Sequence, residues 1–188
     1  GHGSSQLQRM KSVCKSATAL VALGTNLPRD GLSGAALLTR AVEALRLAGL
    51  PPVALSGVWE TPAWPPSDQP NYFNAVVEVG SAGLTPEALY RTLRTLEACF
   101  GRDQRERWGP RTLDLDIIAM DGFVGVFGPI TLPHKRMHER RFVLAPLAEI
   151  APDWRHPGLK TAVSELLAAL PPSPARWVGP LEMLPQKD

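Results

Sequence analysis

The chain has 188 residues, of which 44% are hydrophobic and 20% are charged, as in a typical globular domain large enough to bury a sizeable core. Its 20 basic and 18 acidic residues give a formal net charge of +2, which excludes a polyanion-binding protein that acts through bulk charge. The 19 prolines are about twice the usual share, yet with the 16 glycines they stay below the content of a low-complexity chain.

The first third of the chain is predicted to alternate between strands and helix. Residues 1–16 begin with Gly1-His2-Gly3-Ser4-Ser5, which looks like a cloning remnant, and we treat them as an N-terminal extension. Apolar runs that end at glycine and apolar residues at helical spacing predict the next elements. These are a strand at 17–23, a loop at 25–34, a helix at 35–48 and a strand at 53–60.

The middle of the chain repeats the strand–helix–strand order. Residues 61–70 contain four prolines and cannot form regular structure. Thr85, Pro86 and Glu87 are an N-cap, a first-turn proline and a first-turn acid, which together predict the start of a helix. The expected elements are a strand at 72–79, a helix from 85 to about 100, a charged loop at 101–111 and a strand at 112–120.

Beyond residue 120 we expect a glycine-rich segment at 121–133 with a short strand near 123–127, a helix at 138–150 despite Pro146, and a short helix at 160–170. The tail from Pro171 has five prolines in 18 residues and is expected to be extended or disordered. The order β-α-β-β-α-β followed by helices predicts an α+β, ferredoxin-like fold, an antiparallel sheet with its two main helices on one face. We therefore expect one domain at 17–170 and a proline-rich tail at 171–188.

Two carboxylates lie two residues apart in the predicted strand at 112–120. Side chains at i and i+2 share one face of a strand, so Asp114 and Asp116 point together while Leu113, Leu115 and Ile117 point to the core. Adjacent carboxylates repel each other unless a cation lies between them, and hard oxygen ligands suit Mg²⁺. Two acids on a solvated strand face would give the same pattern.

Fifteen of the 20 basic residues are arginine, and four of these lie within ten residues just before the two carboxylates. An excess of arginine can reflect codon usage, and a charged loop can be merely solvated. However, arginines beside metal-binding carboxylates neutralise a polyphosphate and stabilise a transferring phosphoryl group. The four are Arg102, Arg105, Arg107 and Arg111, with Trp108 presented by the turn at Gly109-Pro110.

Two further clusters carry candidate binding residues. Tyr72 and Asn74 share a strand face after the proline loop, where a ring and an amide could stack on and read a flat heteroaromatic ligand. The alternative is a stiff hairpin connection with Tyr72 in the core. His134 and Arg140 suit a phosphate-facing role better than a metal site, because Pro133 places His134 in a loop and no third soft ligand is near. No Walker A sequence or G-x-G-x-x-G sequence is present.

The run Arg107-Trp108-Gly109-Pro110-Arg111-Thr112-Leu113-Asp114-Leu115-Asp116-Ile117 resembles the signature of the 6-hydroxymethyl-7,8-dihydropterin pyrophosphokinases of folate biosynthesis. The resemblance extends in order over about residues 18–155. It includes Ala22 to Leu27, Glu60-Thr61-Pro62, Gln69 to Asn74, Pro133-His134, Arg140 and Phe142.

This resemblance implies an enzyme that transfers the β,γ-diphosphate of ATP to the pterin hydroxymethyl group and releases AMP. It implies two Mg²⁺ ions on Asp114 and Asp116, and catalytic roles for these two and for Arg102 and Arg111. The implied pterin site is Thr61, Pro62, Trp64, Tyr72, Asn74, Trp108 and Phe142. The implied ATP site is Glu97, Arg107, Ile117, His134 and Arg140.

Some positions depart from the family pattern. Gln104 stands at the second arginine position of the loop, so that either the neighbouring Arg105 substitutes for this arginine or the contact is absent. Thr25 replaces a serine, and Lys135 replaces an aromatic residue.

Two other classes fit parts of the pattern. One is a ferredoxin-like nucleic-acid module that uses Tyr72 and Phe73, although these point to opposite strand faces. The other is a metal-dependent phosphohydrolase built on Asp114 and Asp116.

The remaining expectations concern partners and location. Cys14 and Cys99 are predicted to be free thiols in a reducing compartment, since two cysteines without close spacing make no disulfide framework. No apolar run reaches the length of a membrane span. We therefore expect a cytoplasmic monomer that binds small molecules and neither membrane nor nucleic acid.

Overall fold

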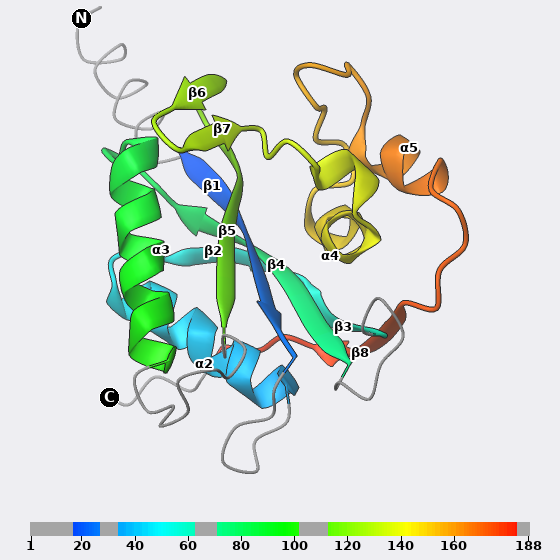
Figure 1. The fold of residues 1–188 in the computed structure, drawn as a ribbon, viewed down its shortest axis with the longest axis horizontal. Helices are drawn as coiled ribbons and strands as arrows, with labels where there is room; N and C mark the ends of the chain where they lie inside the picture. Colours follow the sequence, from blue (N-terminus) through cyan, green and yellow to red (C-terminus); the bar gives the residue numbers. More distant parts are fainter. Residues whose placement is uncertain (1–16, 27–33, 63–70, 102–112, 184–188) are drawn as a thin grey trace, which may run out of the picture.

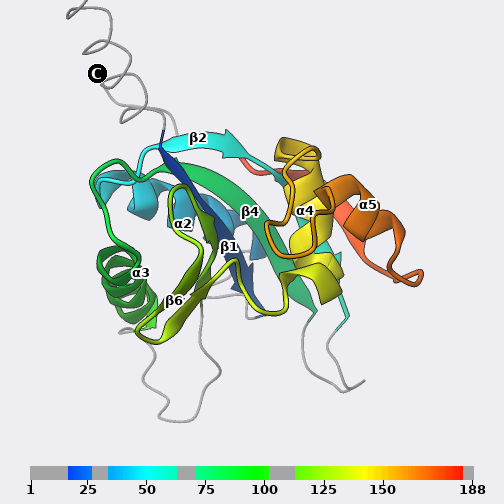
Figure 2. The same ribbon diagram turned by 90° about the horizontal axis from the view of Figure 1, so that it is seen from above.

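The computed structural model describes residues 17–26, 34–62, 71–101 and 113–183. Within these ranges a sheet of six strands runs through the middle of the molecule, with helices on both of its faces (Figures 1 and 2). A short two-stranded hairpin forms a separate sheet, and Ile130 and Leu132 of this hairpin belong to the main core.

The sheet is antiparallel, and its strand order is β5-β1-β4-β3-β8, with β2 also paired to β4. β1 lies parallel to β2 and β3 but is separated from them by β4, which is the split βαβ arrangement of a ferredoxin-like fold. This confirms the predicted α+β fold. The strands are β1 Thr18–Thr25, β2 Pro52–Leu55, β3 Gly57–Thr61, β4 Tyr72–Gly80, β5 Asp114–Met120, β6 Gly125–Phe127, β7 Ile130–Leu132 and β8 Arg176–Pro180. The helices are α2 Gly34–Leu47, α3 Pro86–Gly101, the single 3₁₀ turn η1 Met137–Glu139, α4 Arg141–Ile150 and α5 Val163–Ala168.

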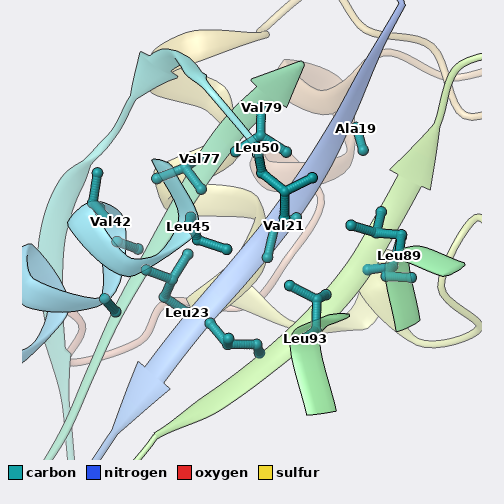
Figure 3. Packing of buried hydrophobic residues seen from close by; sticks show 14 of the residues in the cluster. Ala19, Val21, Leu23, Val42, Leu45, Leu50, Val77, Val79, Leu89 and Leu93 are labelled. Atoms are coloured by element: carbon teal, nitrogen blue, oxygen red, sulfur yellow. The ribbon is translucent and has the colours of Figure 1, made fainter. Parts of the chain in front are cut away.

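The main core lies between the sheet and the two long helices, as predicted. Alternate residues of the central strands, such as Val21 and Val77, pack against Leu45 of α2 and Leu93 of α3 (Figure 3). A second core on the opposite face joins Leu20 and Val76 to residues of α4 and α5, among them Leu144, Leu147 and Val163. The sheet is therefore covered on both faces.

Three elements differ in detail from the predictions. The expected strand at 53–60 is interrupted at Ser56, whose hydroxyl accepts the Val76 N–H (2.9 Å) and donates to the Gly57 carbonyl (2.7 Å). The expected helix at 138–150 is divided, because Arg140 is extended (φ −110°, ψ 104°) between η1 and α4. The expected short strand near 123–127 is present as β6, and it pairs with a strand that was not expected, β7.

The proline-rich tail contains a strand. The tail was expected to be extended or disordered, and its residues 176–180 are extended. They pair with β3 at the edge of the sheet.

No helix in the described ranges is long and apolar enough to cross a membrane. Cys99 is an exposed free thiol, as predicted, whereas Cys14 lies outside the described residues.

Candidate active site

Three neighbouring strands bring polar side chains into one row across the sheet. β1 ends where β4 and β5 begin, and Gly24 of β1 pairs with Asn74 on one side and Asp114 on the other. The next row places Ala22 between Val76 and Asp116. The antiparallel order of β4, β1 and β5 therefore gathers an amide and two carboxylates, although they are 40 residues apart in sequence.

The central strand contributes only small residues to these rows. A Cβ atom added to Gly24 would lie 2.9 Å from the Asn74 Oδ1, so the site has room for no side chain there. Leu115 and Ile117, between and after the two aspartates, are buried in the main core as the period of two predicts. The aspartates thus face the opposite side of the sheet, toward α4.

A cavity of about 840 Å³ opens over these rows. This volume lies in the range of small-molecule binding sites. Nine of the sixteen residues that the sequence predicted for the site line this cavity. They are Thr61, Pro62, Tyr72, Asn74, Asp114, Asp116, His134, Arg140 and Phe142.

The start of α4 forms one wall of the cavity. Phe142 is 38% exposed, which is unusual for so large an apolar side chain, and it lies beside the guanidinium of Arg140 (5.4 Å to the ring centroid). Arg141 follows in the same wall. An exposed ring next to two cations can stack on a flat ligand while the cations bind anionic groups.

His134 is held next to β5 by its backbone. Its N–H donates to the Ile118 carbonyl (2.8 Å), and its ring Nδ1 accepts the Arg136 N–H (3.2 Å). Burial lowers the pKa of His134, Asp116 opposes this shift, and Arg140 and Arg136 reinforce it. The ring is therefore mostly neutral at pH 7, with its proton on Nε2, from which it can donate to a ligand oxygen.

A second cavity of about 440 Å³ adjoins the first. Asp116, His134 and Arg140 line both cavities, so these three form the wall between them. Ile117, predicted as an ATP contact, lines the second cavity only. The remaining lining residues are Tyr90, Arg94, Pro129, Ile130, Thr131, Lys135 and Arg136.

Glu97, another predicted ATP contact, is on α3 and contacts the backbone of β5. It is not among the described residues that line either cavity. Its Oε2 accepts the Leu115 N–H (3.3 Å), and its Oε1 is 2.8 Å from Nε of Arg94. Arg94 also donates to the Leu115 carbonyl and lies 3.9 Å from Asp116. The structure thus places Glu97 where it supports the strand that carries the two aspartates.

The donor set at the two aspartates fits Mg²⁺. Both side chains are at least partly exposed, and both are hard oxygen donors on one sheet face. Within the described ranges no three His, Cys, Asp or Glu side chains are grouped to hold a metal ion. The two carboxylates that the described residues supply suit a cation that keeps several waters and binds substrate phosphates.

Five predicted site residues lie outside the described ranges, namely Trp64, Arg102, Arg107, Trp108 and Arg111.

Other lining residues were not predicted. Ala22 and Gly24 could have been found as small residues two apart on one strand face. No pattern pointed to Ser173 and Pro174, which line the large cavity from the proline-rich tail.

The family model and the similar proteins of known sequence all point to one enzyme family. A family model described as 7,8-dihydro-6-hydroxymethylpterin-pyrophosphokinase (HPPK) matches residues 20–152. A 2-amino-4-hydroxy-6-hydroxymethyldihydropteridine pyrophosphokinase from Methylorubrum extorquens is 41% identical over 156 residues, which cover 82% of this chain and 94% of the relative. The protein of the same name from Pseudomonas aeruginosa is 39% identical over 153 residues, covering 80% and 90%.

Solved structures share the fold. The Plasmodium falciparum HPPK-DHPS protein, crystallised with pterin and p-hydroxybenzoate, superposes with a TM-score of 0.64 at 13% identity. The match covers 81% of this chain but only 42% of the Plasmodium chain. At this identity the comparison supports the fold alone.

Proposed function

Since the chain belongs to the 7,8-dihydro-6-hydroxymethylpterin-pyrophosphokinase family, we propose that the two adjoining cavities hold its two substrates. The protein is a pyrophosphokinase of folate biosynthesis that uses ATP as its co-substrate. It transfers the β,γ-diphosphate of ATP to the hydroxymethyl group of 6-hydroxymethyl-7,8-dihydropterin and releases AMP.

The larger cavity is the proposed pterin site. Tyr72 and Phe142 offer rings for stacking, and Asn74 offers an amide that can read the hydrogen-bonding edge of the pterin. Thr61 and Pro62 complete this end of the cavity. Trp64 and Trp108 remain predicted members of the same site.

The second cavity is the proposed nucleotide site. The wall that it shares with the pterin cavity holds His134, Arg140 and Asp116, where the transferred phosphates would lie. Ile117 lines the nucleotide side. Arg102, Arg107 and Arg111 remain predicted phosphate or adenosine contacts, and Glu97 is proposed to act by supporting β5.

Asp114 and Asp116 are the proposed ligands of two Mg²⁺ ions. When bound, these ions would neutralise the phosphate charge that develops during transfer. The protein itself orients the groups: the pterin hydroxyl oxygen attacks the β-phosphorus, and the bond to the oxygen bridging the α- and β-phosphorus breaks. That oxygen leaves with AMP, and the hydroxyl proton passes to solvent. Positioning and charge neutralisation are sufficient for such a reaction without a covalent intermediate.

The observation that carries this proposal is the shared wall of the two cavities, because a transfer reaction requires that its two substrates meet. We expect Asp114→Asn and Asp116→Asn each to lower pterin-dependent AMP formation by at least about a hundredfold while the protein stays folded. Asp153→Asn, on an exposed turn, is the matched control.

The assay follows AMP and diphosphopterin with Mg-ATP, with and without the pterin. Near-normal turnover in either site variant would overturn the metal assignment. ADP and phosphate as products would indicate a phosphohydrolase instead. A cytoplasmic location and a monomeric state remain part of the proposal, and light scattering in solution measures the latter.

A further inference from the structure

The tail beyond α5 is anchored to the sheet, although it lies outside the residues 20–152 that match the family. β8 pairs with β3 in the register Gly57↔Pro180 and Glu60↔Arg176, as Figure 1 shows at the edge of the sheet. The indole of Trp177 lies over Gly57, where an added Cβ would be 2.0 Å from the indole nitrogen. Leu181 is buried in the main core. These contacts fix where the tail passes the cavity.

The tail also forms part of the cavity itself. Arg141, in the cavity wall, donates to the carbonyls of Leu170 (3.3 Å) and Pro171 (2.6 Å). Two residues further on, Ser173 and Pro174 line the cavity. The segment between these contacts and β8 is therefore held against the opening on the side of Thr61 and Tyr72.

A bridge of three side chains joins β8 to the same end of the cavity. One carboxylate oxygen of Glu60 is 2.7 Å from Arg176, and the other accepts the Asn71 side-chain N–H (2.9 Å). Arg176 and then Asn71 lower the pKa of Glu60, so this carboxylate stays ionised. Asn71 lines the cavity and precedes Tyr72, while Glu60 precedes Thr61.

We propose that Ser173 and Pro174 of the tail form a wall of the pterin site, and that Arg176 and Glu60 are positioning residues for the pterin. The inference rests on the proposed assignment of the large cavity to the pterin. The hydrogen bond from Asn71 to Glu60 links the end of β3 to the start of β4, and the ion pair with Arg176 fixes the position of the Glu60 carboxylate. The bridge thereby fixes where Thr61, Asn71 and Tyr72 stand around the ligand.

The bridge is better suited to positioning than to stability. The side chain of Arg176 is 72% exposed, and exposed ion pairs contribute little to folding because water and salt screen them. An effect on substrate binding without an effect on stability is therefore the expected signature.

The first test reverses the charge of one partner and then of both. We expect Arg176→Glu to raise KM for the pterin about threefold to tenfold, with little change in KM for ATP or in melting temperature. The double variant Arg176→Glu/Glu60→Arg should restore KM, since the amide of Asn71 can rotate to offer its oxygen to an arginine. The matched control reverses Arg46 and Glu43, an ion pair on α2 away from the cavity.

The second test places a larger side chain in the cavity wall and leaves the bridge of Glu60, Arg176 and Asn71 unchanged. Ser173→Tyr should raise KM for the pterin about tenfold and leave nucleotide binding unchanged. Ser164→Tyr, at an exposed position of α5, should change neither.

The outcomes separate the two proposals. Wild-type protein that forms no AMP in the presence of the pterin would overturn the proposed function. Active wild type with unchanged pterin KM in both Arg176→Glu and Ser173→Tyr would overturn the positioning role alone. Equal changes in KM for ATP and the pterin, without rescue by the double variant, would do the same.

Discussion

At the scale of single residues, Gly24 decides how close the ligand can come to the sheet. It lies between Asn74 and Asp114, the amide proposed for the pterin and a carboxylate proposed for Mg²⁺. Any side chain at this position would come between the two groups that are proposed to act on the same pair of substrates. The requirement here is close approach, since the backbone of Gly24 lies in an ordinary strand.

Gly24→Ala is expected to raise KM for the pterin about tenfold and to lower the free energy of unfolding by about 1–2 kcal/mol, because Asn74 must move away from the new methyl group. Steady-state kinetics and urea unfolding measure the two effects. Gly179→Ala is the control, since a Cβ there would meet nothing within 4 Å. An unchanged pterin KM in Gly24→Ala would show that Asn74 does not contact the substrate.

Much of the site could be predicted at this scale because strand geometry has a period of two. That period places Tyr72 with Asn74 and Asp114 with Asp116, and the structure confirms both arrangements. Ser173 could not be found in this way. Its position depends on Arg141 and on the pairing of β8, which are long-range contacts without a local signal.

At the scale of elements, α3 supports the strand that carries the two aspartates. Among the strands that the structure describes, β5 is at the edge of the sheet, so one side of its backbone pairs with none of them. Arg94 and Glu97 of α3 bind the carbonyl and the N–H of Leu115, which replaces the bonds that such a strand would make. The two residues are one turn apart on the helix and form an ion pair.

Arg94→Ala should lower the free energy of unfolding by about 1–2 kcal/mol, because the Leu115 carbonyl loses its side-chain donor. Arg91→Ala, at an exposed position of the same helix, should stay within about 0.5 kcal/mol of the wild type. Urea denaturation compares the two. Equal stability of the two variants would contradict the supporting role of α3.

Local pattern predicted most elements but not their interruptions. Ser56 divides a strand because its hydroxyl reaches the Val76 backbone, and Val76 lies 20 residues away. β8 has too few apolar residues for a pattern to predict it, and its partner β3 is more than a hundred residues earlier. Both features depend on tertiary contacts that override local preference.

At the scale of the whole molecule, the sheet separates a structural face from a functional face. α2 and α3 cover the first with a continuous core (Figure 3), whereas α4 and α5 cover only part of the second. The cavity occupies the part of the second face that α4 leaves open, next to Phe142 and Val143. The same kind of core substitution should therefore affect substrate binding on the second face but not on the first.

Leu45→Ala on the first face and Leu144→Ala on the second should each lower the free energy of unfolding by about 2–5 kcal/mol, since both side chains are fully buried. Only Leu144→Ala should also raise KM for the pterin, because it loosens the helix that carries Phe142 and Arg141. Kinetics well below each melting temperature measure the difference. An equal effect on KM would mean that the two faces are mechanically coupled.

The prolines around β8 have a consequence for association between molecules. Among the described strands β8 is the other edge of the sheet, and its own Trp177 and Val178 are exposed. A long unpaired edge would pair with strands from other copies. Pro174 precedes this five-residue strand and Pro180 is its last residue, and a proline has no N–H to offer a further strand. We therefore expect these prolines to protect the molecule against edge-to-edge aggregation at the strand that follows Ser173 and Pro174 in the cavity wall.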